Sequence, residues 1–223
     1  MTGLSGCRLD SHLGHFRLFS LPNNFTNNAP MAITPKILAF AGSTRAESYN
    51  KKLVKIAAGG ARAAGAEVTY LDLRDIPMPL FDEDLEAQEG LHPNARKFKD
   101  LMQAHQGLLI ASPEYNSSIS GVLKNAIDWA SRPALGEAPG ACFVDKVAAI
   151  MSASPGFLGG LRGLAHVREI LGNVGVIVVP AQITVPKSHE AFNADSTLAH
   201  AKKQAAVEKL GSLVTTMLIK LKA

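Results

Sequence analysis

The chain has 223 residues, of which 47% are hydrophobic and 19% charged, and its formal net charge is +4. This length suits one domain with a substantial core, and the composition is that of an ordinary globular enzyme. Apolar runs such as 108–111 and 176–179 are far too short to cross a bilayer, so no membrane partner is expected. The positive charge gathers in residues 199–223 and leaves the rest close to neutral, which argues against a nucleic-acid partner.

The two cysteines and the N-terminal segment indicate the cellular setting and the limits of the domain. Cys7 and Cys142 lie far apart without metal-ligand spacing, so we expect a cytoplasmic, reducing setting, no disulfide and no metal site. Residues 1–34 carry Asn and Pro without sustained periodicity, and we interpret them as a disordered extension before a domain at 35–223. An organelle transit peptide, or a start assigned upstream of Met31, would also explain that segment.

From Lys36 onward, short apolar segments alternate with amphipathic ones. The apolar segments predict strands at 37–41, 67–72, 107–112, 146–152 and 175–179. The amphipathic segments predict helices from 48 or 50 to 64, at 93–104, at 120–131, at 159–171 and near the C-terminus. Parallel strands need crossover connections, so the alternation predicts an α/β, doubly wound, five-stranded parallel sheet with helices on both faces.

In open α/β sheets, ligands bind beyond the carboxyl ends of the strands, near the point where strand order reverses. After the first strand, Ser43, Thr44 and Ser48 place hydroxyls around a helix start, with Arg45 among them. The free amides and dipole of a helix start favour a phosphate, although an ordinary capped turn would use the same residues. Neither the Gly-x-x-x-x-Gly-Lys-Ser/Thr loop nor the Gly-x-Gly-x-x-Gly fingerprint is present, which excludes the two common nucleotide loops.

Two further loops follow the third and fourth predicted strands. The first contains Pro113, Glu114 and Tyr115, so an aromatic side chain beside exposed amides could hold a flat heteroaromatic ring. Glu114 is a candidate general base, or else a carboxylate that is solvated or paired with backbone. The second loop, 152–160, is rich in glycine, which either admits a planar ligand close to the backbone or only makes the loop flexible.

In this order after successive strands, the motifs resemble the NADPH-dependent FMN reductase family, flavodoxin-like enzymes that include quinone, chromate and azo-dye reductases. The resemblance spans about Lys36–Leu171. It is carried by the loop at 42–50, by Ser112–Asn116 running into Gly121–Trp129, and by the Ser-Pro-Gly loop that begins at Ser154. It implies a flavodoxin-like sheet with strand order 2-1-3-4-5.

The resemblance also implies an FMN site in which the flavin carries the chemistry and no catalytic side chain is needed. The implied cofactor-binding residues are Gly42, Ser43, Thr44, Arg45, Ser48 and Asn50, then Pro113, Glu114, Tyr115, Asn116 and Ser118, then Ser154, Gly156 and Gly159. NADPH or NADH would donate hydride, and a small-molecule acceptor such as free flavin, quinone, azo dye or chromate would follow in a ping-pong sequence. A homodimer or homotetramer built partly on the helix at 121–131 is implied as well.

Two other functions are open on the same fold. A flavodoxin-like electron carrier is usually acidic so that it docks on basic partners, which the near-neutral core does not favour. A regulatory or flavin-free protein would keep the fold without turnover, and purified protein lacking yellow colour would favour it. The residues identify neither the physiological acceptor nor the choice between NADPH and NADH.

Overall fold

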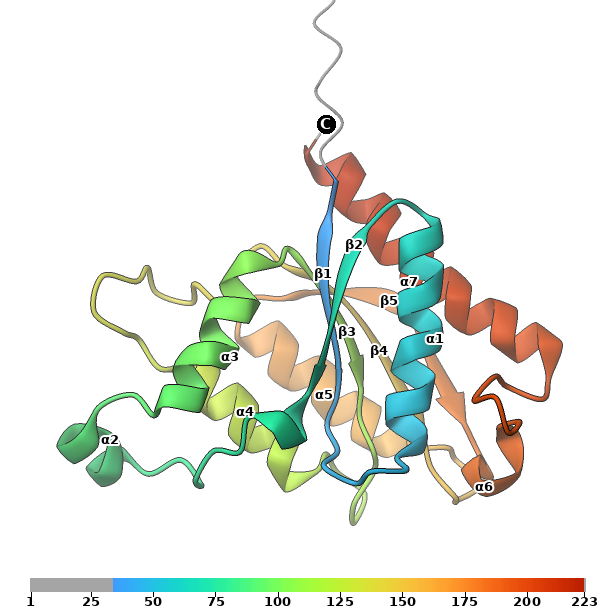
Figure 1. Cartoon of the computed structure of the whole chain (residues 1–223), viewed down its shortest axis with the longest axis horizontal. Coiled ribbons are helices and arrows are strands. Elements are labelled where there is room, and N and C mark those ends of the chain that lie inside the picture. Colours follow the sequence, from blue (N-terminus) through green and yellow to red (C-terminus); the bar gives the residue numbers. More distant parts are fainter. Residues whose placement is uncertain (1–33, 223) are drawn as a thin grey trace, which may run out of the picture. The chain divides into compact units, whose positions relative to one another are not determined.

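Five strands form one parallel sheet in a computed structural model that describes residues 34–222 (Figure 1). The strands are β1 (Lys36–Ala41), β2 (Glu67–Asp72), β3 (Gly107–Ala111), β4 (Val147–Ala153) and β5 (Ile177–Val185). They pair in the order β2-β1-β3-β4-β5, which confirms the predicted flavodoxin-like topology. The extension predicted over residues 1–34 lies outside the described residues apart from Thr34.

Helices cover both faces of the sheet, as parallel crossovers require. They are α1 (Tyr49–Ala63), α2 (Glu83–Glu89), α3 (Pro93–Ala104), α4 (Gly121–Ser131), α5 (Leu161–Asn173), α6 (Ser188–Ala191) and α7 (Ala201–Lys222), with a 3₁₀ turn at Leu73–Asp75. In Figure 1, α1 and α7 lie on one face, and α3, α4 and α5 lie on the other. Alternate strand residues therefore enter two separate cores, as Ile37 and Leu38 of β1 illustrate.

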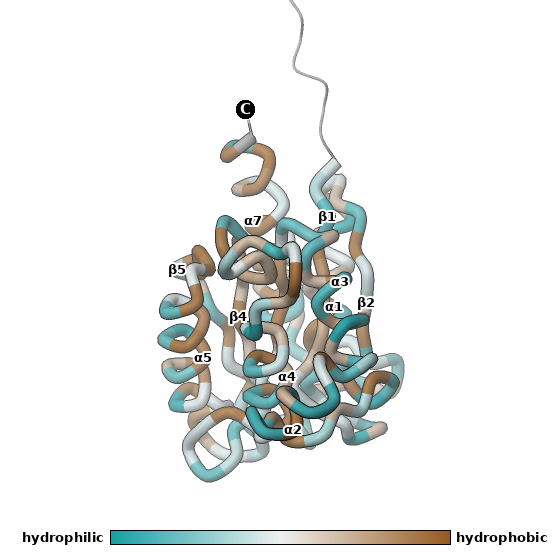
Figure 2. Tube along the Cα trace, turned by 90° about the vertical axis from the view of Figure 1, so that its left-hand side faces the viewer, coloured by the Kyte–Doolittle hydropathy of each residue, from teal (hydrophilic) through white to brown (hydrophobic). Residues whose placement is uncertain are grey.

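Hydrophobic residues recur along the interior strands and alternate with hydrophilic ones along helices such as α5 (Figure 2). Every residue of β3 and β4 is buried, as expected for parallel strands that are covered on both faces. Among the helices of residues 34–222, none is long and apolar enough to span a membrane.

Two glycines allow α1 and α7 to approach each other closely. A Cβ atom on Gly60 would lie 2.0 Å from the carbonyl oxygen of Glu208, and one on Gly211 would lie 1.9 Å from that of Ala57. The hydroxyl of Ser212 also donates a hydrogen bond to the Gly60 carbonyl over 2.9 Å. These contacts fix α1, whose first turn lies at the edge of the sheet where a ligand is expected.

The last strand is longer than predicted. The expected strand at 175–179 stops before Pro180, whereas β5 continues to Val185 because its register against β4 shifts at a bulge around that proline. Arg168 of α5 donates hydrogen bonds to the backbone carbonyls of Val178, Val179 and Pro180, at the start of the bulge. The extra length brings the segment after β5 to the same sheet edge as the loops after β1, β3 and β4.

Two short helices were not predicted. None of the residues of α2 is buried, so it carries no apolar stripe, and α6 is too short to show a periodicity. The other strands and helices that were predicted with bounds agree with the structure to within two residues at each end. Cys142 is buried, and burial raises the pKa of its thiol.

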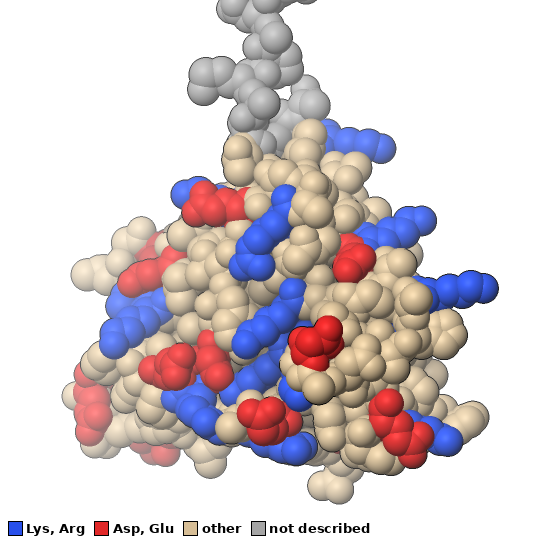
Figure 3. Space-filling model, turned by 45° about the vertical axis from the view of Figure 1, so that its right-hand side comes forward, with Lys and Arg blue, Asp and Glu red and all other residues tan. Residues whose placement is uncertain are grey.

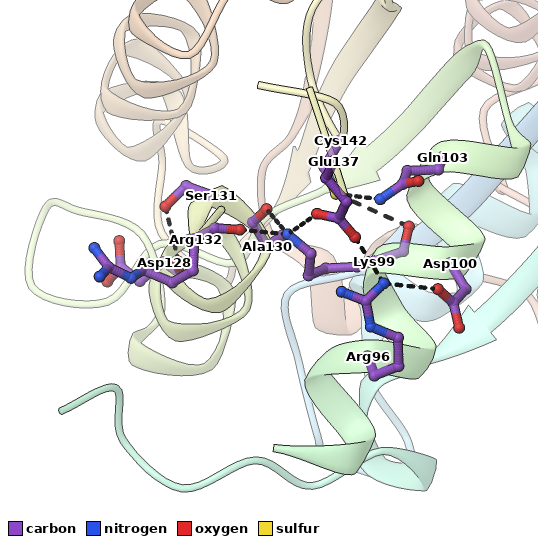
Figure 4. Close-up of polar contacts among 10 residues, drawn as sticks. All are labelled: Arg96, Lys99, Asp100, Gln103, Asp128, Ala130, Ser131, Arg132, Glu137 and Cys142. Carbon is purple, nitrogen blue, oxygen red and sulfur yellow. Dashed lines mark hydrogen bonds and ion pairs between the residues drawn. The ribbon is translucent and has the colours of Figure 1, made fainter. Parts of the chain in front are cut away.

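The segment between α4 and β4 is held to α3 by a buried ion cluster (Figure 4). The Glu137 carboxylate lies 2.6 Å from Arg96 Nη1 and 2.8 Å from Lys99 Nζ. Lys99 Nζ, on a side chain that is almost fully buried, also donates to the carbonyl of Arg132. Burial alone would raise the pKa of Glu137, but hydrogen bonds from Lys99, Arg96 and Gln103 lower it to about 2.

Candidate functional site

The loops singled out in the sequence meet at the carboxyl edge of the sheet, which is the lower edge in Figure 1. They surround a cavity of about 150 Å³. The predicted residues that line it are Ser43, Arg45, Ser48 and Asn50 from the first loop, Pro113, Glu114 and Tyr115 from the second, and Ser154 from the third. Side chains that are separated by more than 100 positions in the sequence therefore face one space.

The start of α1 forms one wall of the cavity. Ser48 is the N-cap residue, but its side chain makes no capping hydrogen bond, and the first turn carries no acidic residue. The Ser43 hydroxyl accepts a hydrogen bond from the backbone N–H of Arg45 over 3.3 Å. Within residues 34–222, no carboxylate lies within ion-pair distance of the Arg45 guanidinium. An uncapped helix start beside an unpaired arginine is suited to an anion.

Asn50 joins the first loop to the third. Its Nδ2 donates to the carbonyl of Ala153 over 2.8 Å, and its Oδ1 accepts from the N–H of the same residue over 2.9 Å. Both polar groups of the amide are thus used in positioning the end of β4 against α1. That Asn50 also contacts a phosphate stays a prediction.

Glu114 connects the second loop to α5. Its Oε2 accepts from the backbone N–H of Gly163 over 2.9 Å, and its Oε1 lies 3.2 Å from Arg162 Nη2. Because the N-cap residue of α5 is Gly160, which has no side chain, the Glu114 carboxylate acts as the cap. The structure agrees with the interpretation of Glu114 as a backbone-paired carboxylate.

Tyr115 lies at the rim of the cavity on a two-residue hairpin turn. The backbone groups of Tyr115 and Ser118 bond each other over 2.9 and 3.0 Å, and Asn116 and Ser117 have φ angles of 51° and 65°. Left-handed conformations at both central residues are typical of a type I′ turn. The turn leaves the tyrosine ring 56% exposed, where a flat ligand can contact it.

Six predicted residues do not line the cavity, namely Gly42, Thr44, Asn116, Ser118, Gly156 and Gly159. The carbonyl of Gly42 accepts from Ser120 Oγ over 2.6 Å, and that of Thr44 accepts from Arg74. These hydrogen bonds hold the first loop in position, although the two residues do not line the cavity.

The remaining four shape the other two loops. Asn116 lies within the hairpin turn, and the Ser118 hydroxyl lies 2.9 Å from Nδ1 of His166. Gly159 has a φ of 62°, and a Cβ there would lie 2.7 Å from the Pro186 nitrogen, so a side chain is excluded. Gly156 meets no such obstacle; its nearest neighbour is the Ser154 hydroxyl.

Sequence reasoning missed Ser188, which lines the cavity from the segment after β5. The residue is fully buried, and its hydroxyl has no hydrogen-bond partner. Its backbone N–H donates to the Ser154 carbonyl over 3.2 Å. Ser188 could have been identified because β5 ends at the same edge of the sheet as the other strands. It was missed because the strand was predicted to end at residue 179.

Charges of both signs are interspersed over the face that Figure 3 shows. Lys51 pairs with Asp72 over 2.6 Å, and Lys52 lies 3.7 Å from Glu47. That the protein has no nucleic-acid partner stays a prediction. In the part of the chain that the structure describes, no group of three or more His, Cys, Asp or Glu side chains is placed to hold a metal ion.

Comparisons with known proteins match the chain to a described family. The family model of NADPH-dependent FMN reductase matches residues 35–190. An NAD(P)H-dependent FMN reductase of Pseudomonas aeruginosa is 36% identical over 175 residues, which cover 78% of this chain and 90% of the relative. An NAD(P)H:quinone oxidoreductase of Solanum tuberosum is 41% identical over 144 residues, which cover 63% of this chain and 70% of the relative.

A solved structure agrees with these matches. The flavoenzyme NAD(P)H:(acceptor) oxidoreductase of Paracoccus denitrificans superposes with a TM-score of 0.68 at 26% identity, covering 84% of this chain and 98% of that one. The chain therefore belongs to the NADPH-dependent FMN reductase family and is an oxidoreductase whose cofactors are FMN and NAD(P)H.

Proposed function

We propose that the cavity at the carboxyl edge of the sheet binds FMN, with the phosphate at the start of α1 and the ring system beside Pro113–Tyr115. The observation that carries this proposal is the meeting of the uncapped helix start and the exposed tyrosine in one cavity. A buried hydroxyl without a partner on the cavity wall also fits a ligand rich in oxygen atoms. Bound FMN would supply hydride transfer, which protein side chains cannot perform by themselves.

The residues of the chain would bind and orient the cofactor. Ser43, Ser48 and the first amides of α1 would donate to the phosphate, and Arg45 would add a charge-assisted hydrogen bond. Asn50 would hold the first and third loops at a fixed separation. The Glu114 cap would fix the second loop against α5 and leave no free carboxylate there to act as a base.

We propose a quinone as the acceptor. Several relatives are named quinone reductases, among them the Solanum tuberosum protein and a quinone reductase of Escherichia coli. Tyr115 at the rim and Phe157 and Leu158 in the adjoining loop are exposed apolar side chains, which suit a flat, weakly polar acceptor. Donor and acceptor would use the same rim in turn, which corresponds to a ping-pong sequence.

We also propose that the protein is a homodimer or homotetramer, but without Trp129 at the contact between subunits. Trp129 of α4 is fully buried and donates from Nε1 to the Pro79 carbonyl over 2.8 Å, so it packs within its own chain. Any contact through α4 would use its exposed residues, such as Lys124 and Ser131. Light scattering of the purified protein would give the number of subunits.

The function is tested by the visible absorption spectrum of the purified protein after addition of FMN, followed anaerobically by NADPH or NADH. We expect flavin bands that bleach with a nicotinamide and return when a benzoquinone is added. Parallel lines in initial-velocity plots are expected for the ping-pong sequence. Bound flavin that resists both donors would indicate an electron carrier, and a failure to bind FMN would contradict the proposed site.

A further inference from the structure

We propose that the hydroxyl of Ser188 donates a hydrogen bond to the ribityl phosphate chain of FMN, which makes the segment after β5 a fourth part of the cofactor site. This inference rests on the proposed function, since it requires FMN in the cavity at the carboxyl edge. Nothing in the sequence around Ser188 indicates such a role.

The first argument is the rarity of buried polar atoms without partners. In folded proteins, nearly all buried side-chain oxygens take part in a hydrogen bond, because a buried hydroxyl without one is unfavourable. Within residues 34–222, only the hydroxyls of Ser152 and Ser188 are buried without a partner. Both lie at the carboxyl edge of the sheet, where the ligand is expected.

The two serines differ in what lies next to their hydroxyls. A Cβ atom on Gly160 would lie 1.9 Å from the Ser152 hydroxyl, so this oxygen is packed against the backbone at the start of α5. Ser152 does not line the cavity, whereas Ser188 lines it together with Ser43 and Ser48. Of the two serines, therefore, only Ser188 belongs to the wall of the cavity.

The surrounding backbone fixes Ser188 in this place. Its N–H donates to the carbonyl of Ser154, and the N–H of Ser154 donates to the carbonyl of Val185 over 3.1 Å. The preceding residue, Lys187, has a φ of 46°, a conformation that residues other than glycine rarely adopt. A rigidly placed hydroxyl can donate to an anionic or ribityl oxygen without an ordering cost at the moment of binding.

The test compares Ser188→Ala with the matched control Ser152→Ala, which removes the other unpartnered hydroxyl. FMN affinity is measured by quenching of flavin fluorescence, and the melting temperature of the FMN-free protein is measured separately. We expect the dissociation constant of FMN to rise about tenfold in Ser188→Ala and less than twofold in Ser152→Ala. Neither variant should melt below the wild type without FMN, because each loses a hydroxyl that has no partner.

The outcomes separate this inference from the proposed function. Equal FMN affinities of wild type and Ser188→Ala would overturn the inference and leave the proposed function standing. A lower melting temperature of FMN-free Ser188→Ala would show that the hydroxyl stabilises the fold, and would also overturn it. A wild-type protein that binds no FMN would overturn the proposed function itself.

Discussion

The ion cluster around Glu137 and the cavity at the carboxyl edge both contain buried polar groups, but they use them in opposite ways. In the cluster, the carboxylate is paired with Arg96 and Lys99, and the ammonium group also reaches backbone carbonyls. At the cavity, the start of α1 has no side-chain cap, and the Ser188 hydroxyl has no partner. Polar groups that satisfy one another hold the fold together, whereas those left unsatisfied beside a cavity indicate where a ligand binds.

The largest effect is expected from Lys99→Met, which breaks the cluster without touching the cavity. The substitution removes the Lys99 charge from the Glu137 carboxylate, which keeps only Arg96 as a charged partner, and it removes the donor to the Arg132 carbonyl, so the free energy of unfolding should fall by about 3 kcal/mol. Urea denaturation measures this loss, and Lys97→Met, at an exposed position of the same helix, is the control with an effect below about 0.5 kcal/mol. FMN affinity at a temperature where the variant is folded should match the wild type.

The pH dependence of stability tests the contribution of the Glu137 carboxylate to the same cluster. The pKa of Glu137 is about 2 in the folded protein against an ordinary 4.5, so the unfolded chain binds the proton more readily. The stability contributed by this carboxylate should be complete above pH 4.5 and lost as the pH falls toward 2. Urea denaturation across this range should show the advantage of wild type over Glu137→Gln shrinking with falling pH. The exposed Glu89→Gln should show no such trend; an identical trend in both variants would contradict the assignment.

Arg45→Ala should have the opposite effect to Lys99→Met, because it is expected to weaken FMN binding without lowering the stability of the fold. Loss of a charge-assisted hydrogen bond to the phosphate is expected to raise the dissociation constant of FMN by about 10- to 100-fold. The free energy of unfolding without FMN should change by less than about 0.5 kcal/mol, since the guanidinium is exposed. Lys209→Ala removes the same charge from the surface of α7 and serves as the control in the FMN titration. Equal titrations of wild type and Arg45→Ala would remove this residue from the site.

The smallest effect is expected from Tyr115→Ala, which alters the rim. The absorption bands of bound flavin should shift because the ring loses an aromatic neighbour, while the dissociation constant rises by only about fivefold. Tyr115→Phe keeps the ring and should retain the wild-type spectrum. If the spectrum and the turnover of Tyr115→Ala were both unchanged, Tyr115 would not contact the flavin.

Patterns of nearby residues were sufficient to predict the sheet, because continuous apolar strands and amphipathic helices are encoded locally. The first loop could be recognised for the same reason, since Ser43, Arg45 and Ser48 lie close together in the sequence. What could not be predicted depends on distant partners. The pairing of Asn50 with Ala153 and that of Glu114 with Gly163 exist only in three dimensions. Ser188 was missed because no local pattern indicates that a strand continues past Pro180.

The double hydrogen bond between Asn50 and Ala153 also has a consequence for the order of folding. The two residues are 103 positions apart, so the first loop reaches its final place only after the chain as far as β4 has joined the sheet. A cofactor that requires this arrangement binds only the nearly complete fold and stabilises it by mass action. The amount of folded enzyme in a cell should therefore follow the supply of flavin, and chains made during flavin shortage should be the first to be degraded.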